Sequence, residues 1–253
     1  MIYNICNRNY NSPILTGHCM AVVEDLKKEA GIAACKYVKN GMKIGLGTGS
    51  TVKYTIIELG RRIAEEDLQI IGVPTSEVTK ELAQSLNIPL SDLAEIGKLD
   101  LTIDGADEFD PNYNLIKGGG GALTREKIVA LASNAMVVVA DDRKQVSTLG
   151  QFPLPVEVTV SNWESVKEQI SHICPGDVNL RETTEVPFVT DNGGYILDCN
   201  FGPMISKPDV LEKRINAFEG VVEVGLFVGI CDVVIISSSS GIKTSTKPNG
   251  RLS

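Results

Sequence analysis

Residues 42–65 read MKIGLGTGSTVKYTIIELGRRIAE, and this stretch decides the fold. It predicts a short apolar strand at residues 42–46, a glycine-rich turn, and a helix at residues 51–65. The turn places backbone N–H groups at the start of a helix, directly beyond the end of a strand. This order is typical of α/β proteins, whose ligands bind at the carboxyl ends of parallel strands.

Apolar strands and helices alternate on both sides of this stretch. Helices are predicted at residues 24–40, 77–86 and 123–133, and strands at residues 68–73, 99–103 and 136–140. Because the strands are continuous apolar runs, we expect a parallel sheet that helices cover on both faces. The fold class predicted for this part of the chain is a Rossmann-like α/β domain.

The pattern changes after Gly150, at a proline-rich segment of residues 151–155. Beyond it we expect a strand at residues 156–160, a helix at 163–173, strands at 187–190 and 195–200, a helix at 209–217 and a strand at 221–227. Asp191-Asn192-Gly193-Gly194 predicts a tight hairpin turn between two of these strands. Strand, helix, hairpin, helix and strand in this order indicate a small α+β unit of the ferredoxin-like type.

These patterns divide the chain into two domains and two tails. We expect an α/β catalytic domain formed by residues 21–149 and 228–245, including a returning strand at 233–237, and a smaller α+β domain at residues 150–227. Residues 1–20 have a turn-forming composition and are expected to be a disordered tail. The serine run at residues 237–240 and the last residues predict another loose end, with a C-terminal tail at residues 246–253.

The composition excludes several classes of function. The 253 residues carry 24 basic and 32 acidic side chains, a net charge of −8, so the protein should repel nucleic acid. No apolar run reaches the ~18–20 residues that a membrane span needs. The six cysteines form no CxxC pair, which favours a reducing compartment and predicts a cytoplasmic location. With only two histidines, His18 and His172, we expect no metal site.

The first functional motif is the glycine-rich turn itself, Gly45-Leu46-Gly47-Thr48-Gly49-Ser50-Thr51. Its backbone N–H groups and hydroxyls, together with the start of the following helix, predict a phosphate cradle. A dinucleotide site is disfavoured, because Ser50 replaces the last glycine of that fingerprint and no acidic residue follows Val73. The simpler alternative is a strand-to-helix turn in which Ser50 or Thr51 caps the helix.

Two more motifs stand where ligands of the sheet would bind. Asp104-Gly105-Ala106-Asp107-Glu108 follows the third strand, and carboxylates this close raise one another's pKa, which suits proton transfer. Lys117 precedes four consecutive glycines, whose N–H groups could bind an oxyanion. Glu126 follows in the first turn of the next helix. The alternatives are a solvated acidic turn, a solvated lysine, and a glutamate that only stabilises its helix.

Together, the three motifs supply a phosphate cradle, an acidic loop, a lysine and a further carboxylate at one edge of one sheet. This set of groups suits the movement of a proton beside the carbonyl of a phosphorylated substrate. A non-catalytic sugar-phosphate sensor is an alternative function. A related enzyme, such as an amino-sugar phosphate deaminase or a coenzyme A transferase, is another.

The three motifs resemble the signatures of the type A ribose-5-phosphate isomerase family. The resemblance runs in order from residue 24 to residue 244 and includes segments at residues 144–158, 190–193 and 220–227. It implies an isomerase of D-ribose 5-phosphate and D-ribulose 5-phosphate in the pentose phosphate pathway, without cofactor or metal, and usually a homodimer. By the same resemblance, the substrate site comprises Thr48, Gly49, Ser50, Thr51, Asp104, Gly105, Ala106, Asp107, Lys117, Gly118, Gly119, Gly120, Lys144 and Lys27.

The resemblance also suggests a mechanism. Glu126 would be the general base that moves a proton from C2 to C1 through a cis-enediolate. Lys117 and the N–H groups of residues 118–121 would stabilise the enediolate oxygens. We assign ring opening to Asp104, with Asp107 close enough to share its proton. The sequence leaves open whether Lys117 acts on the enediolate or on the phosphate.

With two isolated histidines and no cysteine cluster, the chain is predicted to isomerise its substrate without a metal ion. Exhaustive treatment with a chelator should leave the rate unchanged, measured as conversion of ribose 5-phosphate to a ketose. A rate that collapses with chelator and returns with a divalent cation would contradict the proposed chemistry.

Overall fold

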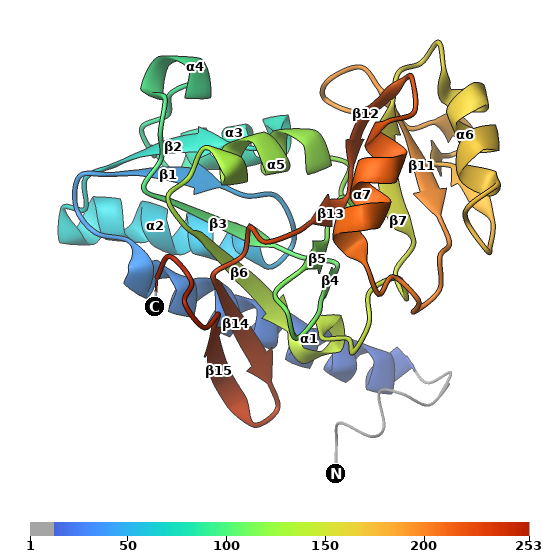
Figure 1. Ribbon diagram of the computed structural model, residues 1–253. Coiled ribbons are helices and arrows are strands. Elements are labelled where there is room, and N and C mark those ends of the chain that lie inside the picture. Colours follow the sequence, from blue (N-terminus) through green and yellow to red (C-terminus); the bar gives the residue numbers. More distant parts are fainter. Residues whose placement is uncertain (1–12, 253) are drawn as a thin grey trace.

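A six-stranded sheet forms the centre of the larger of two units (Figure 1). The computed structural model describes residues 13–252, with side chains from Val23 onward. The strands, in the order β15-β14-β6-β3-β1-β2, are β1 (Met42–Leu46), β2 (Ile70–Pro74), β3 (Leu101–Gly105), β6 (Met136–Asp141), β14 (Val233–Ser238) and β15 (Gly241–Thr246). All run parallel except β15, which pairs antiparallel with β14. The predicted parallel sheet is confirmed.

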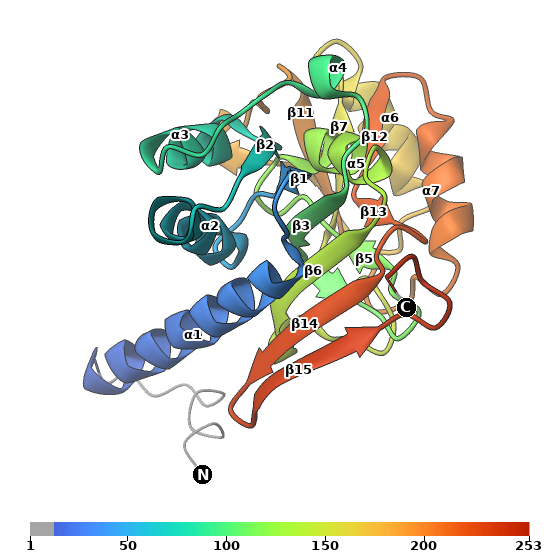
Figure 2. The same ribbon diagram turned by 90° about the vertical axis from the view of Figure 1, so that its left-hand side faces the viewer.

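Helices cover both faces of this sheet (Figures 1 and 2). α1 (Pro13–Ala34) and α2 (Val52–Glu66) lie against one face, and α5 (Leu123–Leu131) lies against the other. The remaining helical segments are α3 (Glu77–Ser85), α4 (Leu93–Ile96) and the short 3-10 helices η1 (Cys35–Tyr37) and η2 (Asp142–Lys144). Because successive strand side chains point to opposite faces, Val137 packs in the cluster with α1 and α2, whereas Met136 packs with Ala130 of α5.

The loops that carry the motifs leave the sheet at its topological switch point. From β1 the chain moves to β2 on one side, and it then returns to β3 on the other side of β1. The carboxyl ends of β1 and β3 are therefore adjacent, with Leu46 paired to Ile103. Open α/β sheets bind ligands at such a point, because the loops after the two strands diverge there. The glycine-rich turn and the acidic loop are consequently neighbours.

The smaller unit is a four-stranded antiparallel sheet with the order β12-β7-β11-β8. Its strands are β7 (Leu154–Val158), β8 (Val178–Leu180), β11 (Tyr195–Cys199) and β12 (Val221–Val224). α6 (Trp163–Ser171) and α7 (Pro208–Asn216) pack against this sheet. The chain order β7-α6-β8-β11-α7-β12 is the ferredoxin-like arrangement that the sequence predicts.

The structure corrects the strand pairing in this unit. The predicted strand at residues 187–190 is wrong, since only Val186–Pro187 is extended, as β10, in a short ribbon with β9 (Glu182–Thr183). β11 pairs instead with β8, whose three residues include the polar Asn179 and are too few to show a period in the sequence. The predicted turn still forms, because the Thr190 N–H donates to the Gly194 carbonyl.

A three-stranded sheet connects the two units and consists of β4 (Glu108–Phe109), β5 (Leu115–Ile116) and β13 (Leu226–Phe227). The strand predicted at residues 221–227 is therefore divided, because β13 pairs with β5 rather than with the smaller sheet. The division falls at Gly225, whose carbonyl accepts from the Lys117 N–H. A Cβ at Gly225 would lie 2.3 Å from the Lys117 carbonyl oxygen, so this close approach requires glycine.

The predicted N-terminal tail is wrong where the structure describes it. α1 begins at Pro13, so residues 13–20 are helical, whereas residues 1–12 lie outside the described part of the chain. Proline is compatible with the first turn of a helix, which allows α1 to extend back beyond its periodic segment. α1 also ends at Ala34 instead of Asn40, and η1 follows it.

The predicted loose C-terminus is wrong as well. Residues 241–246 form β15, because they complete the hydrogen bonding along the edge of β14. Beyond β15, Arg251 forms an ion pair of 2.7 Å with the buried carboxylate of Asp232. The same carboxylate accepts the Met136 N–H at the start of β6. The last described residues are thus tied to the central sheet.

Removal of residues 247–253 should destabilise the fold, because it leaves the Asp232 carboxylate buried without its cation. Since the Arg251 side chain is partly exposed, we expect the free energy of unfolding to fall by about 1–3 kcal/mol. Urea denaturation measures this loss, and removal of residues 252–253 alone is the control. Identical unfolding curves for the two truncated chains would show that the ion pair contributes nothing.

Candidate active site

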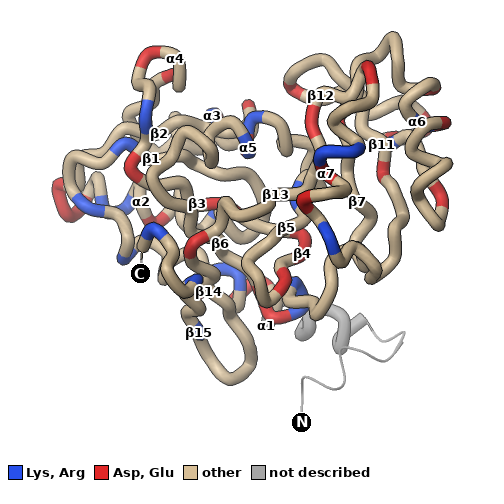
Figure 3. Tube along the Cα trace, in the orientation of Figure 1, with Lys and Arg blue, Asp and Glu red and all other residues tan. Residues whose placement is uncertain are grey.

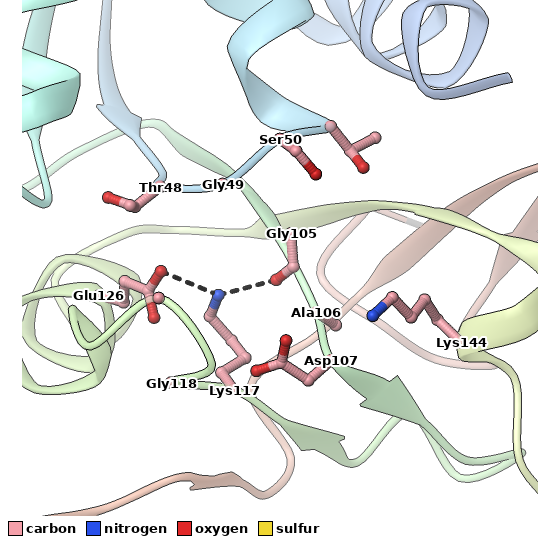
Figure 4. Close-up of a pocket in the computed structure, with 12 residues that line it drawn as sticks. Thr48, Gly49, Ser50, Gly105, Ala106, Asp107, Lys117, Gly118, Glu126 and Lys144 are labelled. Carbon is pink, nitrogen blue, oxygen red and sulfur yellow. Dashed lines mark hydrogen bonds and ion pairs between the residues drawn. The ribbon is translucent and has the colours of Figure 1, made fainter. Parts of the chain in front are cut away.

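A pocket opens at the carboxyl ends of β1 and β3 (Figure 4). Its lining comes from all three motifs and from η2: Thr48, Gly49, Ser50, Thr51, Gly105, Ala106, Asp107, Lys117, Gly118, Gly120, Glu126 and Lys144. Two further predicted residues, Asp104 and Gly119, contact lining residues without lining the pocket themselves. Segments far apart in the sequence therefore meet as the motifs predict.

The glycine-rich turn packs directly on Asp104. A Cβ at Gly47 would lie 2.2 Å from Asp104 Oδ1, so the approach requires glycine. The Thr48 N–H donates to the same oxygen at 3.1 Å. The Thr48 hydroxyl points away from the pocket and contacts the hydroxyls of Thr75 and Thr79. The shape of the turn is therefore set by contacts within the protein.

The start of α2 is left without a capping side chain. Thr51 occupies the N-cap position, yet its side chain accepts no hydrogen bond from the helix. Gly49 has a φ of +138°, a backbone conformation that favours glycine. Ser50 points toward the pocket (Figure 4). The N–H groups of Lys53 and Tyr54 donate to backbone carbonyls, whereas those of the two preceding residues make no hydrogen bond within residues 13–252. Free N–H groups at a helix start attract anions, which is the feature that the predicted phosphate cradle requires.

A buried lysine joins two buried carboxylates at one side of the pocket, and Figure 4 shows its contact with one of them, Glu126. Lys117 Nζ lies 3.1 Å from Asp104 Oδ2 and 3.3 Å from Glu126 Oε1, and it donates to the Gly105 carbonyl at 2.7 Å. The three N–H groups of the ammonium thus all face protein oxygens. Glu126 Oε2 is buried and makes no hydrogen bond within the described part of the chain, so this oxygen still lacks a partner.

The pKa values of these three groups depend on two effects, burial and the charges of the neighbouring groups. Burial raises the pKa of Glu126 to about 8, and the Asp104 charge adds to this rise while the Lys117 charge opposes it. Burial also raises the pKa of Asp104, against the effect of Lys117. For Lys117, burial favours the neutral form, but the two carboxylates more than offset it, and its pKa is raised. Two carboxylates thus share one cation, which favours retention of one exchangeable proton.

The glycine loop has two of its N–H groups already bonded. The Gly119 N–H donates to Asp107 Oδ2 at 2.7 Å, and the Gly121 N–H donates to the Gly118 carbonyl at 3.0 Å. The N–H groups of Gly118 and Gly120 make no hydrogen bond within residues 13–252, and both residues line the pocket. Of the four N–H groups predicted to bind an oxyanion, these two are available.

The two remaining predicted lysines are placed differently. Lys144 extends from η2 into the pocket, opposite Glu126 (Figure 4). Lys27, on α1, does not line the pocket, and its ammonium lies 3.4 Å from Glu24 of the same helix. Contact between Lys27 and a phosphate would require this pair to break, and it stays a prediction.

Two contributions to the site were not predicted. One is the hydroxyl cluster around Thr48, for which the only signal was a run of small polar residues after β2. The other is Arg181, just beyond β8, which donates to the Gly118 carbonyl at 2.8 Å. The sequence carries no signal for this contact, because the two residues are 63 positions apart and a polar arginine in a loop is ordinary.

The sequence matches the profile of the family described as Ribose 5-phosphate isomerase A (phosphoriboisomerase A) over residues 71–241. The chain belongs to this family. It is 48% identical over 220 residues to a Ribose-5-phosphate isomerase A 1 of Oceanobacillus iheyensis, which covers 87% of this chain and 97% of the relative. It is also 48% identical over 227 residues to a Ribose-5-phosphate isomerase A of Rhodopseudomonas palustris, with the same coverage of 87% and 97%.

Solved structures agree with this assignment. Ribose 5-phosphate isomerase A of Methanocaldococcus jannaschii superposes with a TM-score of 0.84 at 44% identity, covering 88% of this chain and 99% of the other. A D-ribose-5-phosphate isomerase in complex with phospho-erythronic acid gives 0.85 at 41% identity, covering 88% and 98%. The predicted family, the α/β fold class and the assignment as an isomerase are confirmed.

The described residues contain neither a membrane-spanning helix nor a cluster of metal-ligating side chains. None of their helices combines the length and the apolar character that a membrane span requires. No cluster of three or more histidine, cysteine, aspartate or glutamate side chains with the geometry of a metal site occurs among them.

The raised pKa of Glu126 predicts the pH dependence of turnover. A base must be ionised to accept a proton, so a raised pKa moves the loss of activity on acidification to higher pH. We expect kcat to fall on the acid side with an apparent pKa well above the ordinary value of 4.5 and toward about 8. Because kcat reports the enzyme–substrate complex, the phosphate of free substrate does not contribute. A kcat that stays flat down to about pH 5 would contradict this prediction.

Proposed function

We propose that this chain interconverts D-ribose 5-phosphate and D-ribulose 5-phosphate, a step of the pentose phosphate pathway, with Glu126 moving the proton. The observation that carries the proposal is the buried carboxylate of Glu126. Lys117 holds one of its oxygens at 3.3 Å, and the other has no hydrogen bond within the described residues. A base that lines the pocket, is held in one orientation and keeps one unpaired oxygen meets the geometric requirement of proton transfer.

The proton moves between two neighbouring carbons of the open-chain sugar. Glu126 removes it from C2, which leaves the electron pair in a C1–C2 double bond and negative charge on O1. Glu126 then returns the proton to C1, while the hydroxyl proton of O2 moves to O1 and the ketose forms. No proton is gained or lost overall. The raised pKa suits this cycle, because a base with a pKa near the working pH both accepts and releases a proton.

Lys117 supplies charge to the enediolate, and the glycine loop supplies hydrogen bonds. The ammonium already faces Asp104, Glu126 and the Gly105 carbonyl, so it acts through its charge in a buried site, where such interactions are strong. The direct donors are the N–H groups of Gly118 and Gly120. These positions favour the enediolate over the phosphate as the group that Lys117 stabilises.

Ring opening is better assigned to Asp107 than to Asp104. The Asp104 side chain is fully buried, accepts the N–H groups of Thr48 and Gly105, and does not line the pocket. Asp107 lines the pocket and is oriented by the Gly119 N–H. In this assignment Asp107 takes the proton of the anomeric hydroxyl and gives one to the ring oxygen, as the bond between C1 and that oxygen breaks. Asp104 holds Lys117 and raises the pKa of Glu126.

The phosphate of the substrate is assigned to residues 48–51. This turn ends at the uncapped start of α2, and Lys144 lies across the pocket from Glu126. Binding of the phosphate there fixes the position of the sugar carbons relative to Glu126. Binding energy from a group that does not react thereby supports the chemical step through orientation.

We also propose that the protein acts in the cytoplasm, as a homodimer, without nucleic-acid or membrane partners. The described cysteines Cys35, Cys174, Cys199 and Cys231 are all free and buried, which is typical of a reducing compartment. Acidic and basic residues are interspersed along the chain (Figure 3), unlike the basic stripe of a nucleic-acid-binding protein. The dimer rests on the family resemblance alone, and light scattering during size-exclusion chromatography tests it.

Replacement of the proposed base, Glu126→Gln, should abolish most of the turnover. The amide keeps the size of the side chain but cannot accept a proton near neutral pH, so kcat should fall by about 10²–10⁴-fold. Substrate affinity should change little, because the phosphate contacts residues 48–51. Steady-state kinetics with ribose 5-phosphate measure both quantities.

The matched control is Glu164→Gln, which changes an exposed first-turn glutamate of α6 outside the pocket. A glutamate that only complements its helix contributes ~0.3–1 kcal/mol of stability and no turnover. If Glu126→Gln behaved like this control, with near-normal kcat and a slightly lower melting temperature, Glu126 would be removed from the mechanism.

A further inference from the structure

A single arginine of the smaller unit donates hydrogen bonds to the carbonyls of the glycine loop. Arg181 Nη1 donates to the Gly118 carbonyl at 2.8 Å and to the Gly119 carbonyl at 3.2 Å. Arg181 does not line the pocket, so it reaches the loop from the outer side. These two carbonyls belong to the peptide groups whose N–H groups are those of Gly119 and Gly120.

Because a peptide group is planar, a hydrogen bond to its carbonyl also fixes the direction of its N–H. In a trans peptide the C=O and the N–H point in opposite directions. With its carbonyl bonded to Arg181, the Gly118–Gly119 peptide points its N–H at Asp107, and that bond is present at 2.7 Å. By the same geometry, the Gly119–Gly120 peptide directs the Gly120 N–H away from Arg181 and toward the pocket that Gly120 lines.

Arg181 is itself held in place by other parts of the smaller unit. Its Nε donates to Asp198 Oδ2 at 2.9 Å, and its Nη2 donates to the other oxygen of the same carboxylate. Its guanidinium carbon lies 5.9 Å from the centre of the Phe188 ring. The planar guanidinium is well suited to this task, because it forms a two-point bond with a carboxylate and keeps further N–H groups for the carbonyls.

The glycine loop needs such a contact, because it has no side chains of its own to fix it. Glycine reaches more backbone conformations than any other residue, so ordering a glycine run costs the most entropy. Gly118 and Gly121 both have positive φ, and the only internal bond of the turn is from the Gly121 N–H to the Gly118 carbonyl. This bond fixes neither the Gly119 N–H nor the Gly120 N–H.

We infer that Arg181 is a positioning residue for the isomerisation: by holding the carbonyls of Gly118 and Gly119, it aims the Gly120 N–H at the enediolate and the Gly119 N–H at Asp107. This inference rests on the proposed function of the same pocket. It assigns to the smaller unit a part in the reaction, although that unit contributes no residue to the pocket lining. Arg181 acts on the transition state through backbone groups that carry no side chain.

The test compares Arg181→Met with Arg251→Met. Arg251 is a matched control, because it also pairs with a carboxylate and donates to two backbone carbonyls, those of Ser133 and Ile230, but does not line the pocket. Removing one oxyanion donor outright costs about 10²–10³-fold in kcat. In Arg181→Met the donor is still present but points in the wrong direction. We therefore expect kcat to fall by roughly 10–100-fold and KM to change by less than about threefold. Arg251→Met should lower thermal stability and leave kcat within about twofold of wild type.

Arg181→Lys serves as the conservative variant. Its ammonium can still donate to the two carbonyls but loses the two-point bond with Asp198, so we expect kcat within roughly tenfold of wild type and above that of Arg181→Met. If Arg181→Met fails to fold, a lowered kcat in folded Arg181→Lys together with an unchanged kcat in Arg251→Met supports the inference. Wild-type kcat in both folded Arg181 variants would overturn it.

A binding measurement separates this inference from the proposed function, since it needs no turnover. Phospho-erythronic acid carries a carboxylate where the enediolate oxygens of the substrate would lie, whereas inorganic phosphate probes only the phosphate site. Calorimetry should show that Arg181→Met weakens the binding of phospho-erythronic acid by about tenfold or more. The same variant should weaken the binding of inorganic phosphate by less than about twofold. Equal weakening of both ligands, or of neither, would overturn the role of Arg181. Failure of wild type to isomerise ribose 5-phosphate would instead overturn the proposed function.

Discussion

The buried ammonium of Lys117 is the interaction on which the rest of the site depends. Asp104 at the end of β3 and Glu126 in the first turn of α5 both lie within 3.3 Å of it. A buried cation is tolerated only where its partners are in place, so β5 and β13 must bring Lys117 to the sheet edge before the site exists. The same arrangement provides one more carboxylate than cation. This imbalance, together with the burial of the three side chains, raises the pKa of Glu126 to about 8.

The smaller unit helps to fix the orientation of Glu126, which lies outside that unit. Glu126 lies in the sequence between Thr124 and Lys127, and each of these is bonded to the smaller unit. The Thr124 hydroxyl donates to Glu157 of β7, and the Lys127 ammonium pairs with Glu223 of β12 at 2.7 Å. Rotation of α5 about its axis would break both contacts. The Glu126 side chain is therefore held by its helix, and the helix is held by a sheet that contributes no residue to the pocket lining.

Burial decides which aspartate of the acidic loop reaches the pocket. The motifs favour Asp104 for ring opening, with Asp107 close enough to share its proton. In the structure the close packing of Gly47 encloses Asp104, while Asp107 stays at the pocket and is bonded to the glycine loop. The start of α2 is decided in the same way, because Thr51 could have capped the helix and does not. These outcomes follow from how loops pack on one another, which residue types alone do not specify.

The α/β class, the ferredoxin-like unit and the meeting of the three motifs at one sheet edge were determined by the sequence, because apolar periodicity and glycine turns act over a few neighbouring residues. The tertiary structure alone decided the pairing of β8 with β11, the division of the strand at Gly225 and the place of β15 at the sheet edge. It alone brought Arg181 to the Gly118 carbonyl across 63 residues. Such contacts depend on which surfaces are buried together once the chain has folded. A local sequence pattern cannot predict them, because the two partners lie far apart in the chain.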